Sequence, residues 1–127
     1  MDLNSILALL DGEMITAEPD LSQVVVGGGA ADLMSDVLAY AQPDLLLLTG
    51  LVNPQAVRAA EIAGIRAILF VRGKRPPAET VAIAQDIGIP LLRTRYTMYE
   101  ACGRLYVAGL PGLGLCDDFE AEEQAGA

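Results

Sequence analysis

Histidine and tryptophan are absent from this chain of 127 residues, and only two cysteines occur. Without histidine there is no Ser-His-Asp or Cys-His nucleophile pair, no histidine-ligated zinc site and no imidazole acid–base catalyst. The two cysteines, Cys102 and Cys116, are too few for a disulfide framework, which favours reduced thiols and a cytoplasmic location. The sequence therefore excludes several common catalytic and metal chemistries.

Long apolar runs are also missing. The longest aliphatic run is Leu45–Leu48, far short of the roughly 20 apolar residues that span a bilayer. The first four residues, Met1–Asn4, lack the basic start and the apolar stretch of a secretory signal. Hydrophobic residues nevertheless make up 53% of the chain, enough for a packed core. These features predict one folded domain outside the membrane.

Basic residues are scarce and unevenly placed. Eight Lys and Arg residues stand against 17 Asp and Glu residues, which gives a net charge of −9 and disfavours nucleic acid or an anionic membrane as partner. All the bases lie between Arg58 and Arg104. The segment 111–127 is rich in glycine and acids and has little to bury, so we expect a flexible tail after a domain of residues 1–110.

Hydrophobic periodicity and turn residues predict alternating helices and strands. Asn53-Pro54 is a helix start, because Asn caps free backbone donors and Pro suits the first helical position; Gly64 and Gly88 suit helix ends. The glycine triplet Gly27–Gly29 is predicted to end a strand. The predicted helices are 3–10, 30–41, 54–63, 76–87 and 97–109, and the predicted strands are 14–16, 23–26, 45–48, 67–71 and 90–93.

A short internal repeat supports this order of elements. Val57-x-x-Ala60-x-x-x-Gly64-Ile65 recurs 24 residues later as Val81-x-x-Ala84-x-x-x-Gly88-Ile89. Each copy has the pattern of a helix, a glycine at its end and the start of a strand. Apolar strands that alternate with helices indicate a mostly parallel sheet covered on both faces. The fold class is therefore α/β, a single three-layer domain.

Four predicted loops should meet at the carboxyl ends of the parallel strands, where such sheets bind ligands. Glycine N–H groups approach anions closely, and Arg and Lys side chains bind phosphate or carboxylate groups. An anionic small molecule is the ligand that this chemistry favours. The candidate binding residues are Gly27, Gly28, Gly29, Thr49, Gly50, Arg72, Lys74, Arg75, Thr94, Arg95 and Thr97.

Each of these features also has a purely structural explanation. The glycine triplet is equally a plain turn, and the basic loop 72–75 is equally a solvated loop. Asp32 stands where a dinucleotide fingerprint has its third glycine, and no Gly-Lys-Ser/Thr of a P-loop occurs. Asp32 and Asp36 suit the positive end of a helix dipole better than acid–base or metal chemistry. We expect no catalytic residue, no metal ligand and no cofactor.

Three segments resemble a known family. The run Gly28–Leu38 is similar to the Asp-Leu-Leu-Ser-Asp-Val-Met stretch of DRTGG-domain proteins, above all small stand-alone forms encoded beside iron-hydrogenase and NADH-dehydrogenase-like subunits. The segments Gly88–Thr94 and Tyr99–Tyr106 resemble the closing strand and helix of that subgroup. The resemblance implies a fold shared with the N-terminal domain of HPr kinase/phosphorylase. The chain departs from the family's Thr-Gly-Gly, since Arg72-Gly73-Lys74 follows the strand that ends at Val71.

The resemblance implies a regulatory or oligomerising module, because DRTGG domains accompany CBS domains and some phosphotransacetylases. Our leading hypothesis is a non-enzymatic regulatory or assembly module, homodimeric, with a redox-enzyme or signalling partner. Dimerisation also suits a small apolar domain that completes its core with a second copy. The alternative is a sensor for a small phosphorylated metabolite or nucleotide at the carboxyl ends of the strands. HPr-type serine kinase activity is disfavoured, because the P-loop of that enzyme is missing.

Overall fold

The computed structural model describes residues 1–17 and 20–114. Helices and strands alternate along most of this part of the chain. The helices are α1 (Leu3–Leu10), α2 (Met34–Tyr40), α3 (Pro54–Ala63), α4 (Ala78–Ile87) and α5 (Met98–Val107). The strands are β1 (Glu13–Met14), β2 (Gly27–Ala30), β3 (Leu45–Thr49), β4 (Ala67–Phe70) and β5 (Leu91–Arg93).

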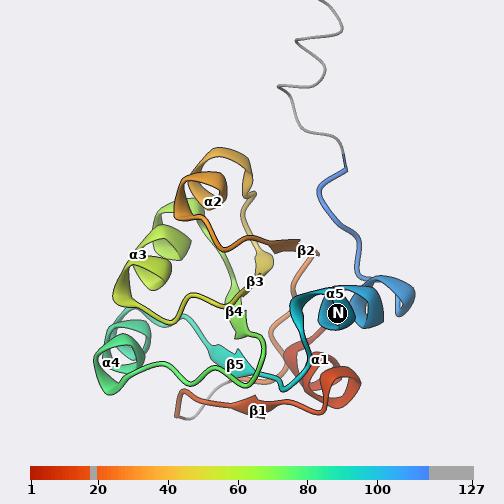
Figure 1. Ribbon diagram of the computed structural model, residues 1–127, viewed down its shortest axis with the longest axis horizontal. Helices are drawn as coiled ribbons and strands as arrows, with labels where there is room; N and C mark the ends of the chain where they lie inside the picture. The colour runs from red at the N-terminus through yellow and green to blue at the C-terminus, as the bar shows by residue number, and fades with distance from the viewer. Residues whose placement is uncertain (18–19, 115–127) are drawn as a thin grey trace, which may run out of the picture.

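The strands form one sheet in the order β1-β5-β4-β3-β2. Strands β2 to β5 run parallel, each beside the next in sequence, and β1 pairs with β5 in the antiparallel direction. Helices α2, α3 and α4 cover one face of the sheet, and α1 and α5 cover the other (Figure 1). This confirms the predicted α/β fold with three layers and a mostly parallel sheet.

The apolar run in β3 supplies both cores, because successive side chains of a strand point to opposite faces. Leu46 and Leu48 pack with α1 and α5, whereas Leu45 and Leu47 pack with the opposite layer. Burial on both faces explains why this strand is apolar throughout rather than alternating. No helix in residues 1–17 and 20–114 has the length and hydropathy to cross a membrane.

The helix boundaries with capping residues are confirmed. The side chain of Asn53 accepts a hydrogen bond from the Ala56 N–H at 3.1 Å, and Pro54 is the first residue of α3. Gly64 and Gly88 follow α3 and α4 with φ of 74° and 80°, in the left-handed region that glycine occupies without a steric cost. The repeat thus contains two successive helix–glycine–strand units.

The strand predicted at 23–26 is wrong in its position, because the sheet strand is the glycine-rich β2 that follows it. Residues 23–25 pair instead with the first residues of the chain, and the Val25 N–H donates to the Met1 carbonyl at 2.9 Å. The helix predicted from Ala30 begins only at Met34, since the chain is extended as far as Leu33. The β-branched residues at 23–26 favour a strand by propensity. Backbone pairing, however, places the strand at Gly27–Ala30.

The segment Leu110–Leu113, here named the clasp, explains why β2 is made of glycines. The Gly28 N–H donates to the Pro111 carbonyl at 2.8 Å, and Leu110 and Leu113 pack into the cores on opposite faces of the sheet. A methyl group on Gly27 would lie 2.9 Å from the Pro111 carbonyl oxygen. The clasp therefore leaves no room for a side chain at Gly27, whereas Gly29 has room for a methyl group. The predicted flexible tail lies largely outside the described residues, which end at residue 114.

Candidate functional site

Part of the predicted anion site assembles where β3 and β4 end. Thr49 is the last residue of β3, and Gly50 follows it; both are buried. The Asp32 carboxylate reaches this point from the segment before α2. It accepts hydrogen bonds from the Gly50 N–H at 2.7 Å and from the Thr49 hydroxyl at 3.1 Å. An acidic side chain of the protein itself therefore occupies the donors that were predicted to bind a ligand.

Asp32 is the residue that sequence reasoning misplaced. It was expected to act on the dipole of a helix starting at Ala30, yet it precedes the helix and bonds to the loop after β3. Asp36 does lie in the first turn of α2, as expected. A carboxylate held by a backbone N–H and a hydroxyl shows that this loop is suited to accept an anion.

Arg72 brings a positive charge to the same place. Its backbone φ of 61° is unusual for a residue with a side chain, and its N–H donates to the Tyr96 carbonyl at 2.8 Å. Its guanidinium lies against Gly50 so closely that a methyl group there would collide with Nη2. Within residues 1–17 and 20–114, no ion pair of Arg72 is found. The absence of a side chain at Gly50 leaves the space that the arginine guanidinium occupies.

Two threonines of the predicted site have structural roles. The Thr94 hydroxyl is buried, donates to the Leu10 carbonyl at 2.7 Å and accepts from the Tyr96 N–H at 3.3 Å. Thr97 caps α5, accepting a hydrogen bond from the Glu100 N–H at 3.4 Å. The exposed Arg95 lies between them. This loop thus supports Arg72 through its backbone.

The remaining basic residues separate from this group. Arg75 pairs with Glu13 of β1 at 3.2 Å, and the same carboxylate pairs with Arg93 at 2.6 Å. Lys74 is exposed. The structure therefore brings Thr49, Gly50 and Arg72 together, whereas Arg75 lies near β1 at one edge of the sheet.

The glycine triplet is not the predicted loop between a strand and a helix. Gly27, Gly28 and Gly29 belong to β2 itself, and the Gly28 N–H is already bonded to the clasp. Whether any of the three contacts a ligand stays a prediction, but the geometry expected of an anion-binding loop is absent here.

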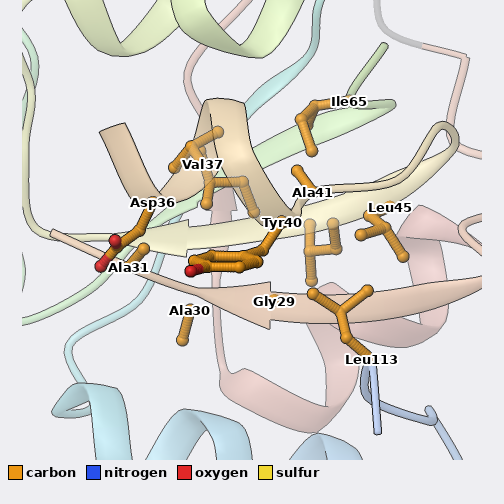
Figure 2. Close-up of a pocket in the computed structure, with 12 residues that line it drawn as sticks. Gly29, Ala30, Ala31, Asp36, Val37, Tyr40, Ala41, Leu45, Ile65 and Leu113 are labelled. Atoms are coloured by element: carbon orange, nitrogen blue, oxygen red, sulfur yellow. The ribbon is translucent and has the colours of Figure 1, made fainter. Parts of the chain in front are cut away.

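An apolar cavity of about 250 Å³ lies between β2 and α2. It exists because Gly29, Ala30 and Ala31 have little or no side chain to fill the space. Figure 2 shows Asp36 and the ring hydroxyl of Tyr40 near one end and Leu113 of the clasp at the other. Arg, Lys and His are absent from the lining, so the cavity does not suit a phosphorylated ligand.

Large apolar side chains are exposed at Ile62 of α3 and in two further groups. The first group lies on α2 and on the segments that flank β2, and Tyr40 in it lines the cavity; its residues are Val24, Val26, Leu33, Leu38 and Tyr40. On α5, Tyr99, Tyr106 and Val107 have exposed fractions of 88%, 71% and 88%. Sequence reasoning missed both surfaces, although Tyr99 and Tyr106, on the side of the last helix opposite Ala101 and Leu105, were a usable signal.

Cysteine and metal chemistry find little support. Cys102 is half-buried on α5, and burial raises the pKa of its thiol, which disfavours the reactive thiolate form. Cys116 lies outside the described residues. In the part of the chain that the structure describes, no group of three or more Cys, Asp or Glu residues is placed to hold a metal ion.

Comparison with solved structures finds a similar fold. One match is the regulatory region of Clostridium perfringens pyrophosphatase, its CBS and DRTGG domains, complexed with the activator diadenosine tetraphosphate. The TM-score is 0.69 at 18% sequence identity, over 87% of this chain and 47% of that one. This chain thus spans about half the length of its structural neighbour. No protein-family model matches the chain, and a search of curated proteins finds no match. The likeness supports the DRTGG-related fold expected from the sequence.

Proposed function

We propose that this chain is a non-enzymatic regulatory or assembly module that acts as a homodimer. One observation carries the proposal: tyrosine and aliphatic side chains, which most domains bury, are exposed in two groups on this small domain. One surface is the exposed face of α5. The other is formed by α2 and the segments that flank β2, and it includes Tyr40 of the cavity lining. Two such surfaces suit a module that pairs with itself and binds a second protein.

The structural neighbour supports a regulatory role, since the region compared is regulatory in the pyrophosphatase to which it belongs. A protein partner from a redox or signalling complex is proposed from the sequence resemblance. The acidic residue that lines the cavity, Asp36, favours a partner segment with basic residues.

The oligomeric state tests this function. We expect the melting temperature of the full chain to rise with protein concentration, because dissociation of a dimer is then coupled to unfolding. Sedimentation velocity should show a monomer–dimer equilibrium over the same range. A sedimentation coefficient that stays monomeric at every concentration would contradict the proposal.

A second candidate function is a sensor for a phosphorylated metabolite or nucleotide, and Arg72 favours it. A cation packed on Gly50, beside a carboxylate that already holds the loop donors, is an arrangement in which a stronger anion replaces Asp32. The activator of the structural neighbour, diadenosine tetraphosphate, carries phosphates, as the sensor hypothesis requires.

Thermal melting across nucleotides, phosphate esters and carboxylates separates the two functions. A sensor should be stabilised by one anion, by RT ln(1 + [L]/Kd), which is about 2.7 kcal/mol at a ligand concentration of 100 Kd. Arg72→Ala should remove this shift. Arg75→Ala should retain it, because Arg75 pairs with Glu13 away from Gly50. If no anion of the panel shifts the melting temperature, the sensor hypothesis is excluded for those anions.

A further inference from the structure

The outward face of α5 is apolar along its length. Ala101 and Leu105 point into the core, and Tyr99, Gly103 and Tyr106 follow one another on the opposite side at spacings of four and three residues. The helix is ten residues long, about 15 Å, so the two tyrosines lie near its two ends. Between them the face is flat, because Gly103 has no side chain.

Gly103 has no explanation within one copy of the chain. Glycine inside a helix costs about 1 kcal/mol relative to alanine. A methyl group at this position would meet no atom within 4 Å, so no packing requirement inside the domain demands a glycine. Glycine does allow the backbone of a second helix to come close. The position therefore faces open space, in which the backbone of a second helix has room to approach closely.

We infer that α5 is the self-pairing surface, where a second copy packs its own α5 antiparallel about a two-fold axis between residues 102 and 103. This rests on the proposed homodimer and identifies its interface. Residues 99 and 106 are equally far from that axis, so Tyr99 of each copy meets Tyr106 of the other. A two-fold axis requires just such a self-complementary patch.

Charge favours a second copy as the occupant of this face. Glu100 and Arg104 form an intrahelical pair at 3.4 Å, and both side chains are about half exposed. In the antiparallel arrangement Glu100 lies level with Arg104 of the second copy, within about one residue's rise of 1.5 Å. Two further ion pairs thus become possible without moving either helix. The face adds no like-charge repulsion to two chains of net charge −9.

The surface around the cavity fits a second copy less well. Asp36 lines the cavity, and α2 contains no basic residue. Two copies joined at this surface would bring their Asp36 carboxylates together, and like charges facing one another are destabilising. That surface therefore remains available for a basic partner while α5 joins the copies.

Sedimentation velocity on the full chain and single variants tests the inference. Tyr106→Glu should raise the dimer Kd about 100-fold, because the substitution occurs twice at the interface at about tenfold each. Ile62→Glu is the matched control: Ile62 on α3 is 75% exposed, and its substitution should leave the Kd unchanged. Circular dichroism should show that both variants fold.

Gly103→Ala distinguishes a role of Gly103 at the interface from a role in the fold of a single copy. It should raise the melting temperature of the diluted monomer, through better helix propensity, and at the same time weaken the dimer. A dimer of wild-type affinity in both Tyr106→Glu and Gly103→Ala would overturn the assignment of α5 and leave the homodimer standing; Leu38→Glu would then test α2. A wild-type chain that is monomeric throughout would overturn the homodimer itself.

Discussion

Replacing Phe70 with alanine is expected to lower the free energy of unfolding by about 3–5 kcal/mol. Phe70 is the last residue of β4, has no exposed surface and packs in the core under α2, α3 and α4. Removing the ring leaves a cavity that the surrounding strands and helices cannot close. Since small domains are stable by only about 5–15 kcal/mol, the loss is a large fraction of the total.

Urea denaturation followed by circular dichroism, at one fixed protein concentration, measures this change. The matched control is Ile62→Ala on α3, where an aliphatic side chain is 75% exposed and its removal should change stability by less than about 0.5 kcal/mol. Equal losses in the two variants would mean that the core is not arranged as described.

Gly27→Ala is expected to cost about 1–3 kcal/mol, although it adds only one methyl group. That methyl would lie 2.9 Å from the Pro111 carbonyl oxygen and 3.1 Å from a Leu45 methyl group. The Pro111 backbone cannot move away from this methyl group without displacing the clasp from β2. We therefore expect faster proteolysis of residues 110–113 as well as lower stability.

Gly29→Ala is the control for this experiment, because its methyl would meet only Leu113, at an ordinary distance of 3.7 Å. Alanine there should be neutral or stabilising by about 0.4–1 kcal/mol, since it restricts the unfolded chain. Limited proteolysis and melting of both variants compare the two positions directly. Similar behaviour of the two would show that the clasp does not constrain β2.

The parts of the fold that sequence predicted are those governed by local signals. Asn53-Pro54, Gly64 and Gly88 mark helix ends through their own backbone preferences, and the apolar run at Leu45 marks a central strand. The position of β2 depended on a long-range contact instead. A glycine triplet ends a strand by propensity, yet here it pairs with β3 along four residues and also bonds to Pro111, more than 80 residues away in sequence.

The same distinction holds for the candidate site. Strand ends predicted that Thr49, Gly50 and Arg72 would meet, because parallel strands end at one edge of the sheet. Sequence offered no means of seeing that Asp32 would bond to Gly50, or that Glu13 would pair with Arg75. Both depend on which side chain reaches which loop after folding. The exposure of Tyr99 and Tyr106 likewise follows from the packing of α5, not from residue type.

The clasp has a consequence for how the protein resists aggregation. An edge strand with bare backbone groups is a template for joining further strands, and β2 has no bulky or charged side chain to discourage this. Pro111 accepts a hydrogen bond from β2 but has no N–H with which to continue a ladder. At β2 the sheet thus ends against a residue that cannot donate a hydrogen bond to a further strand. A fragment ending at Gly109 would lose that protection and become a nucleus for fibrils.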